Sequence, residues 1–211
     1  LHMKPLREFC SFENLRRLLR LLGPSQHLHE AYVRRQPLSY LPMLAHIEDA
    51  TYGLPQSEPR AHVPYMLRDG MDEHAVKSML GTFEHTGLFA IFARHLCYAE
   101  PRIALEEALS NHAEEVVGAT FRYTQELLRR RYGTPRLPDR RLCPVTVFAL
   151  GKFGGRELGW ASDLELLFVY DGQGTTDGEH AIAMSEYVAR FVCKFLRLLK
   201  VPHHTTFALD L

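Results

Sequence analysis

The chain has 211 residues, of which 46% are hydrophobic and 24% charged, a composition typical of a globular protein and too apolar for a disordered one. Its 25 Lys and Arg residues balance its 25 Asp and Glu residues, and this zero net charge argues against a general electrostatic attraction to nucleic acid or to an anionic membrane. No apolar run approaches the roughly 20 residues of a membrane-spanning helix, and no secretory signal opens the sequence. We therefore expect a cytoplasmic protein that binds neither nucleic acid nor membranes.

The cysteines are scattered and form no C-x-x-C motif, which favours a reducing cytosol in which they serve as small buried side chains. They are Cys10, Cys97, Cys143 and Cys193.

Up to about residue 140, apolar residues recur at helical spacing. Between residues 12 and 22, four leucines follow the i, i+3, i+4, i+7 pattern of an amphipathic helix, and we expect them to be core residues. They are Leu15, Leu18, Leu19 and Leu22. Gly23 and Pro24 end this helix, and a second helix extends from Ser25 to Pro37. Residues 50–70 are rich in Pro and Gly and predict an ordered loop.

Two longer helices are expected next. Asp72 is a suitable N-cap for a helix that runs to about residue 97, with a possible break at Gly81. Pro101 suits a first helical position, and a longer helix covers about residues 111–132 before Gly133 ends it. We therefore predict a helical lead-in region over residues 4–141, with residues 133–142 as its linker to the rest of the chain.

The remaining residues, 142–211, predict a second domain that contains strands. An apolar, β-branched run predicts a strand over residues 145–150, and a glycine-rich turn with a short helix comes next, over residues 154–158. The pattern then predicts a second strand at residues 163–170 and a turn-rich loop at 171–178. A helix at 179–200 and a third strand at 206–211 are expected after the loop. The chain as a whole therefore predicts an α+β fold.

Two acids in the second predicted strand indicate a candidate binding site. Asp163 and Glu165 are two residues apart, so both project from one face, while Leu164, Leu166 and Phe168 point to the opposite face and into a core. Paired carboxylate oxygens at this spacing suit Mg²⁺ or Mn²⁺. The glycine-rich turn just upstream lets backbone N–H groups face an anion. Together these features describe a site for a metal and a nucleoside triphosphate.

Other phosphate-binding motifs fit this stretch less well. The glycines run G-x-x-G-G-x-x-x-G instead of the G-x-G-x-x-G of dinucleotide-binding folds, and Lys152 is followed by Phe153 where a P-loop needs Ser or Thr. A tight turn before a strand with surface acids is the alternative that these residues leave open. On that interpretation Gly151, Gly154 and Gly155 serve the turn alone.

The stretch resembles a known family. It is similar to the signature of the nucleotidyltransferase superfamily that includes polymerase beta. The matching residues are Leu150-Gly151-Lys152 and, after ten further residues, Asp163-Leu164-Glu165-Leu166. More narrowly, A-L-G-K-F-G-G-R-E-L and the later S-D-L-E-L-L-F resemble the glutamine synthetase adenylyltransferase (glutamate-ammonia-ligase adenylyltransferase) family. Residues 207–211 resemble the start of the strand that carries the family's third carboxylate, which makes Asp210 the candidate.

The resemblance implies a small polymerase-beta-like mixed sheet with flanking helices, and roles for individual residues. It implies Asp163, Glu165 and Asp210 as catalytic residues and as ligands of Mg²⁺ or Mn²⁺. The nucleotide-binding residues that it implies are Gly151, Lys152, Gly154, Gly155 and Ser162. With ATP or ADP as nucleotide, AMP would move to or from a tyrosine of glutamine synthetase by two-metal in-line displacement, and a nitrogen-signalling regulatory protein is a second expected partner.

Some residues depart from the family pattern. Glu165 stands where the family usually has Asp, and Gly159 and Ala161 replace residues that are usually polar. A regulatory or binding module that keeps the fold without catalysis is therefore the alternative function. A nucleotidyltransferase acting on nucleic acid or a small molecule is a third, which the neutral charge disfavours. Family members are several times longer, so we expect the catalytic domain to be incomplete at its C-terminal end. Arg156 is expected to lie at the surface.

Overall fold

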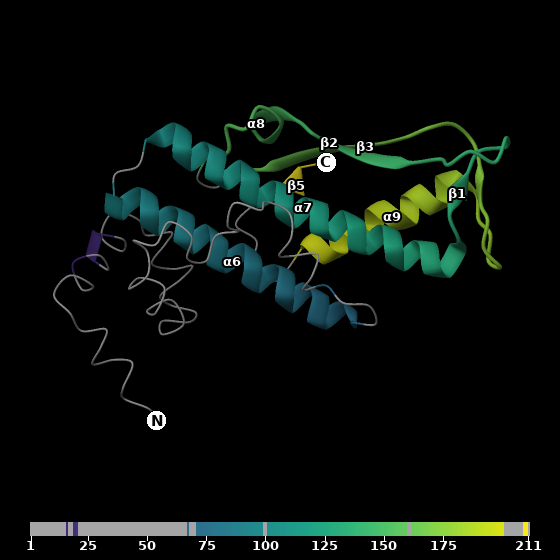
Figure 1. Cartoon of the computed structure of the whole chain (residues 1–211), viewed down its shortest axis with the longest axis horizontal. Coiled ribbons are helices and arrows are strands. Elements are labelled where there is room, and N and C mark those ends of the chain that lie inside the picture. Colours follow the sequence, from purple (N-terminus) through teal and green to yellow (C-terminus); the bar gives the residue numbers. More distant parts are fainter. Residues whose placement is uncertain are drawn as a thin grey trace, which may run out of the picture.

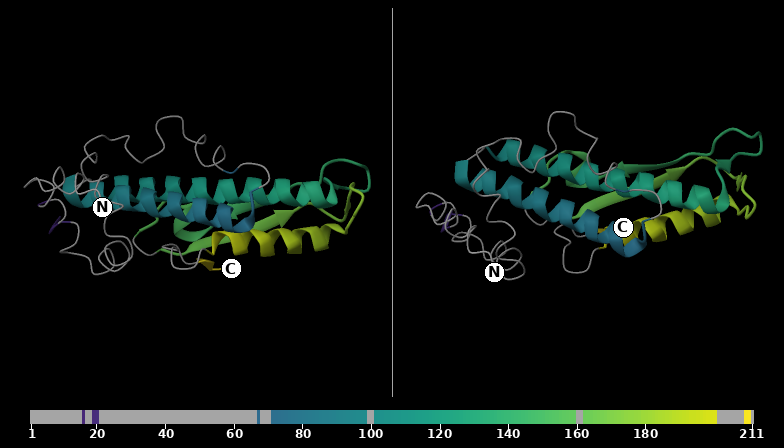
Figure 2. Two further views of the ribbon diagram at one scale, coloured as in Figure 1. Left: turned by 90° about the horizontal axis from the view of Figure 1, so that it is seen from below. Right: turned by 60° about the horizontal axis from the view of Figure 1, so that its bottom comes forward.

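The computed structural model describes residues 71–98, 101–159 and 162–200, with residues 16, 19, 20 and 67 and the backbone of residues 209–210. Two long helices, α6 (Glu73–Tyr98) and α7 (Arg102–Tyr132), lie side by side along the molecule. A small sheet and a third helix, α9 (Met184–Leu199), pack against α7 (Figures 1 and 2). Helices and a small sheet in separate layers make this an α+β fold, as predicted.

Helix α6 begins where the sequence predicts. The Asp72 carboxylate accepts a hydrogen bond from the Ala75 backbone N–H (2.7 Å), which confirms the N-cap. The break predicted at Gly81 is wrong, because α6 continues through it to Tyr98. Glycine in a helix interior costs about 1 kcal/mol, and burial of Leu80 and Leu88 on either side opposes that cost.

Helix α7 starts earlier than the apolar pattern predicts. It begins at Arg102, directly after Pro101, and ends at Tyr132, where Gly133 adopts a φ of 85°. The first turns are held by the burial of Leu105 and Leu109, whereas Ile103 is exposed. Because Ile103 is apolar but exposed, the apolar residues of the first turns do not follow the spacing of a single buried helix face.

The predicted linker at residues 133–142 is ordered by pairing with the loop between the second predicted strand and the last helix. Within the linker, β1 (Pro135–Arg136) pairs antiparallel with β4 (Thr175–Thr176). Arg136 Nε donates to Asp177 Oδ2 and the Thr134 N–H to Asp177 Oδ1, each at 2.7 Å. An isolated antiparallel bridge joins Thr175 to Ala183, and α9 begins directly after it at Met184 and not at residue 179.

The main sheet has the strand order β2-β3-β5. Strands β2 (Val145–Ala149) and β3 (Leu164–Tyr170) are antiparallel, and β5 (Leu209–Asp210) lies parallel to β3. The single helical turn α8 (Gly151–Gly154) comes directly after β2, three residues before the predicted position. The β2-β3-β5 sheet therefore contains one antiparallel and one parallel pair of strands.

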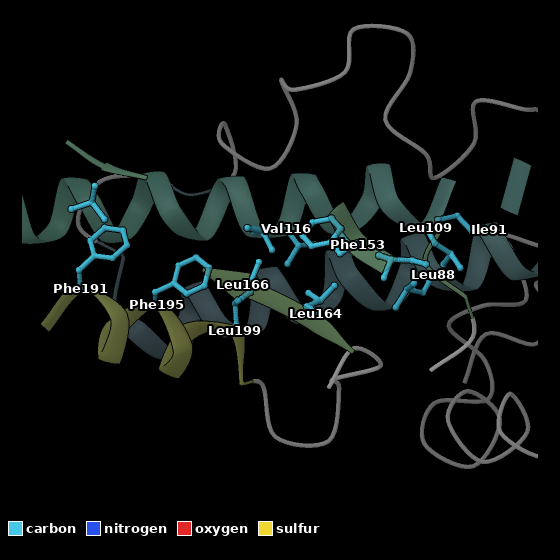
Figure 3. Close-up of a cluster of buried hydrophobic side chains, with 14 of the residues drawn as sticks. Leu88, Ile91, Leu109, Val116, Phe153, Leu164, Leu166, Phe191, Phe195 and Leu199 are labelled. Carbon is cyan, nitrogen blue, oxygen red and sulfur yellow. The ribbon is translucent and has the colours of Figure 1, made fainter. Parts of the chain in front are cut away.

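One hydrophobic core joins the helices to the sheet (Figure 3). The ring of Phe191 on α9 packs edge-on against Phe121 of α7, with centroids 4.9 Å apart, and Phe168 of β3 packs on Phe195 at 5.2 Å. Because this core holds side chains from both sides of residue 141, the division into domains at 141/142 stays a prediction. Among the described residues no helix is long and apolar enough to cross a membrane.

Two sequence expectations about burial need correction. Leu19, predicted as a core residue, is 65% exposed, and the other leucines of its stripe lie outside the described residues. Cys143 is buried as expected, but Cys193 is exposed on α9. The helical spacing of α9 turns its apolar residues inward and Cys193 outward.

Candidate functional site

The two predicted acids lie at the start of strand β3. Asp163 directly precedes the strand and Glu165 is its second residue; both are exposed, whereas Leu164 and Leu166 between and after them are buried. This alternation confirms that the two acids share one face of the sheet and that the leucines face the core. Within the described part of the chain, neither carboxylate has a hydrogen bond or ion pair.

Past the acids, the same sheet face is apolar. Phe148 and Leu167 are register partners on β2 and β3, and Val169 lies two residues further along β3; all three are exposed. By strand alternation, Asp163 and Glu165 are the charged residues that β3 and its approach place on this face. The negative charge is therefore concentrated at one end of the sheet.

The glycine turn contacts Glu165. Gly151 adopts a φ of 52°, and a Cβ at this position would overlap the Glu165 carboxylate. The Leu150 N–H also donates to the Glu165 carbonyl oxygen at 2.9 Å. Only glycine combines this backbone conformation with so close an approach. The turn and the acid, fourteen residues apart in sequence, therefore meet at the end of the sheet.

The other glycines of the turn differ in what they require. A Cβ on Gly154 would lie 2.5 Å from the Ala149 carbonyl oxygen, so this position needs glycine to pack on β2. Gly155 has a φ of −78° and a Cβ there would make only ordinary contacts, the nearest at 3.5 Å. Nothing within the described chain requires glycine at 155. Lys152 is exposed on the same turn.

Ser162 is held by its own turn. Its side chain is buried, and its hydroxyl oxygen accepts a hydrogen bond from the Gly159 N–H at 2.9 Å. The Ser162 N–H in turn donates to the Gly159 carbonyl at 3.3 Å. This closed turn sets the entry of the chain into β3, and a contact between Ser162 and a nucleotide stays a prediction.

The backbone brings the third predicted acid next to the second. In the parallel pair of β3 and β5, Asp210 is the register partner of Glu165, and neighbouring strands lie about 4.8 Å apart. The Asp210 side chain lies outside the described residues. Among the side chains that are described, no three His, Cys, Asp or Glu residues form a cluster of metal-binding size. Carboxylate oxygens are ligands that suit Mg²⁺ or Mn²⁺, and a metal site formed by Asp163, Glu165 and Asp210 stays a prediction.

The structure also connects the glycine turn to helix α7, which the sequence does not indicate. Arg156 is exposed, as expected, but its guanidinium contacts Asn111 Oδ1 and Glu114 Oε2 on α7. Asn111 and Glu114 are 45 and 42 residues away in the sequence. Their three-residue spacing on a helix face is the only sequence signal that they act together, and it is a weak one.

Comparison with known proteins gives a consistent picture. The family model described as glutamate-ammonia ligase adenylyltransferase matches residues 15–210. A protein of Thioalkalivibrio sulfidiphilus is 29% identical over 187 residues, covering 86% of this chain and 19% of its own length. One of Aromatoleum aromaticum is 28% identical over 179 residues (84% and 19%), and one of Chromobacterium violaceum is 31% identical over 163 residues (76% and 17%).

All three relatives carry the name bifunctional glutamine synthetase adenylyltransferase/adenylyl-removing enzyme. The chain spans about a fifth of the length of these curated relatives, 19% in the first of them.

Proposed function

Because the chain belongs to the glutamate-ammonia ligase adenylyltransferase family, we propose that it is a nucleotidyltransferase module that moves AMP between ATP or ADP and a tyrosine hydroxyl of glutamine synthetase. The observation that supports this proposal is the contact between Gly151 and Glu165, which brings a glycine-rich backbone turn against one of two exposed carboxylates on the same sheet face.

The acids are the residues proposed to hold the metal. Asp163, Glu165 and Asp210 would bind Mg²⁺ or Mn²⁺, which when bound stabilise the attacking and leaving oxygens of a displacement at phosphorus. The backbone of the turn, at Gly151, Gly154 and Gly155, would face the nucleotide phosphates. The exposed Lys152 ammonium would balance their charge, and Ser162 would border the same phosphates from the start of β3.

Two balanced reactions are open to this site. In adenylylation, the tyrosine oxygen attacks the α-phosphorus of ATP, the bond to the β-phosphate oxygen breaks, and pyrophosphate leaves. In phosphorolytic removal, an oxygen of inorganic phosphate attacks the α-phosphorus of the tyrosyl-AMP ester and forms ADP, while the bond to the tyrosine oxygen breaks and that oxygen leaves and takes up a proton. Asp210 is the acid proposed to accept the proton of the tyrosine hydroxyl in the first case. A nitrogen-signalling regulatory protein would set the direction, and the reaction would take place in the cytoplasm.

The test starts with binding. Mn²⁺ and ATP are titrated calorimetrically into the 211-residue chain and into its Asp163→Asn and Glu165→Ala variants. We expect saturable binding by the parent chain and its loss in both variants, because each change removes a metal-binding oxygen. Glu107→Gln, which removes an exposed acid from α7, is the matched control and should bind as the parent does.

Activity is then measured with α-labelled ATP and glutamine synthetase, and in reverse with adenylylated glutamine synthetase and phosphate. Label transfer or ADP release that disappears with Asp163→Asn supports the proposal. Folded parent protein that neither binds Mn²⁺ and ATP nor transfers AMP contradicts it and favours a module without catalysis. Because the chain spans about a fifth of its relatives, a longer piece of the protein is tested in parallel to separate an inactive site from an incomplete one.

A further inference from the structure

Arg156 closes the glycine turn in an unusual backbone conformation. Its φ is 60°, in the left-handed region that side chains other than glycine rarely adopt. Its N–H donates to the Phe153 carbonyl oxygen at 3.1 Å, which completes the turn after α8. A non-glycine residue persists in this conformation only when its surroundings hold it there.

The backbone bonds of residues 156 and 157 support this conformation, as at many helix ends, and the side chain of Arg156 adds contacts with helix α7. One guanidinium nitrogen, Nη2, donates to Asn111 Oδ1, and the other, Nη1, lies 3.4 Å from Glu114 Oε2. Asn111 and Glu114 lie on one face of α7, so the planar guanidinium bridges two acceptors at once. The start of the turn is fixed by the Leu150–Glu165 backbone bond, its middle by Phe153 buried in the core, and its end by Arg156 on α7.

The turn's own backbone hydrogen bonds are local. Gly154 N–H donates to Leu150 O at 2.9 Å, Gly155 N–H to Gly151 O at 3.0 Å, and Glu157 N–H to Lys152 O at 2.7 Å. Such bonds keep the shape of the turn, and the bond from the Leu150 N–H to the Glu165 carbonyl oxygen places only its start beside β3. The place matters because Gly151 touches the Glu165 carboxylate.

We propose that Arg156 is a positioning residue: its guanidinium, bound to Asn111 and Glu114 of α7, holds the end of the glycine turn, residues 154–157, in place so that the turn faces the nucleotide phosphates. The nucleotide in this statement rests on the proposed function, whereas the anchoring of the turn to α7 does not. The same guanidinium is not free to bind phosphate while both acceptors on α7 hold it.

Four variants of the 211-residue chain test this. Arg156→Ala removes the guanidinium and leaves a Cβ at a positive φ, whereas Arg156→Gly removes the guanidinium and relieves the backbone. Asn111→Leu removes one acceptor without touching the turn, and Asn111→Asp keeps an acceptor oxygen at that place. Arg102→Ala, which breaks the exposed pair with Glu106 (2.5 Å) on the same helix, is the control for loss of an arginine from this surface.

Two readouts are used on each: hydrogen exchange of the amides at 154–157, and calorimetric titration of Mn²⁺ and ATP. The Arg156 and Glu114 side chains are 47% and 58% exposed, so each lost contact is expected to change both readouts by about two- to fivefold. We expect faster exchange and weaker binding in Arg156→Ala, Arg156→Gly and Asn111→Leu, with β2 and β3 amides unchanged. Asn111→Asp and Arg102→Ala should match the parent.

The proposal is overturned if Arg156→Gly or Asn111→Leu keeps parental exchange at 154–157, because the backbone conformation alone would then hold the turn. It is also overturned if exchange rises while Mn²⁺–ATP affinity stays that of the parent, because the anchor would then not serve the site. If the parent chain binds no Mn²⁺ and ATP, the proposed function fails for this chain, and the exchange data still decide whether Arg156 anchors the turn.

Discussion

Gly151 is the residue at which backbone conformation and site chemistry meet. Alanine at this position would be strained by the φ of 52° and would push the Glu165 carboxylate away. We expect Gly151→Ala to lower the free energy of unfolding by only about 1–2 kcal/mol, because Glu165 has a flexible side chain, and to weaken Mn²⁺–ATP binding by about tenfold. Urea unfolding and calorimetry measure the two effects. Gly155→Ala, at a φ of −78°, should leave stability unchanged; equal destabilisation by both would contradict the contact.

His112 is a second residue whose surroundings determine its behaviour. It is fully enclosed between α6 and α7, its ring stacks on Phe83 with centroids 4.9 Å apart, and Nε2 donates to the Glu84 carbonyl at 3.1 Å. Burial lowers the pKa of His112 from 6.5 to about 4, and the hydrogen bond to Glu84 offsets this only in part. The neutral ring is therefore the form that the fold contains.

A lowered histidine pKa predicts a defined pH dependence. Between pH 6.5 and 4 the unfolded chain takes up a proton that the folded chain does not, so stability is complete above pH 6.5 and falls as the pH drops toward 4. The total loss is about 3 kcal/mol. Urea unfolding at several pH values should show this slope, and His112→Gln should remove it while the exposed His74→Gln retains it. A parent chain with the same slope as His112→Gln would contradict the assignment.

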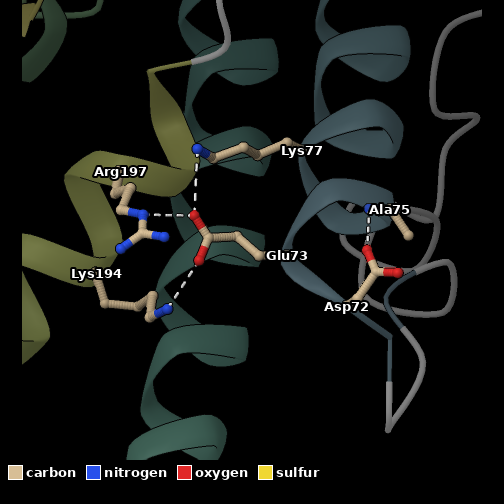
Figure 4. A network of polar contacts seen from close by, with 6 residues as sticks. All are labelled: Asp72, Glu73, Ala75, Lys77, Lys194 and Arg197. Carbon is tan, nitrogen blue, oxygen red and sulfur yellow. Dashed lines mark hydrogen bonds and ion pairs between the residues drawn. The ribbon is translucent and has the colours of Figure 1, made fainter.

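At the scale of elements, a charge network joins the start of α6 to the end of α9 (Figure 4). The Glu73 carboxylate contacts Lys77 Nζ at 3.2 Å, Lys194 Nζ at 3.0 Å and Arg197 Nε at 2.6 Å. Burial raises the pKa of Glu73, but the hydrogen bonds from Lys194 and Lys77 outweigh it and lower the pKa to about 2. This contribution to stability is present above pH 4.5 and is lost as the pH falls through about 2.

Removing the Glu73 charge leaves three cations facing one another. Because the Glu73 side chain is 26% exposed, we expect Glu73→Gln to lower the free energy of unfolding by about 1 kcal/mol, less at high salt. Glu126→Gln breaks an exposed pair with Arg130 (3.1 Å) and should change stability by less than about 0.5 kcal/mol. Equal effects of the two substitutions, or an effect of Glu73→Gln that is independent of salt, would show that the network does not join α6 to α9 energetically.

At the scale of the whole molecule, the aromatic core decides whether the helical region and the sheet unfold together. Phe191 is fully buried and contacts Phe121 of α7 and Phe168 of β3. We expect Phe191→Ala to cost about 3–5 kcal/mol and to lower a single unfolding transition seen by far-ultraviolet and near-ultraviolet circular dichroism alike. Two separate transitions, of which only one shifts, would support the independent domains predicted to meet at residues 141/142. Val192→Ala, on the half-buried side of α9, is the milder control.

Local rules account for what the sequence predicts correctly. The alternation Asp163-Leu164-Glu165-Leu166 needs only the two-residue period of a strand to put the acids on one face. Asp72 begins a helix and Gly133 ends one through backbone chemistry that involves a few neighbouring residues. The resemblance to the adenylyltransferase family also depends on a contiguous stretch, and the family model confirms it.

Tertiary packing decides the rest, because contacts between elements depend on where whole helices and strands lie. The start of α7 at Arg102 is stabilised by buried leucines that an exposed Ile103 conceals in the sequence. Gly151 contacts Glu165, and Arg156 is bonded to Asn111 of α7. Neither pair is related by the residue spacing of a helix or a strand. The sequence by itself determined which residues are proposed for the chemistry; only the tertiary structure decided that the turn, the acids of β3 and helix α7 meet, since burial of a shared core brings them together.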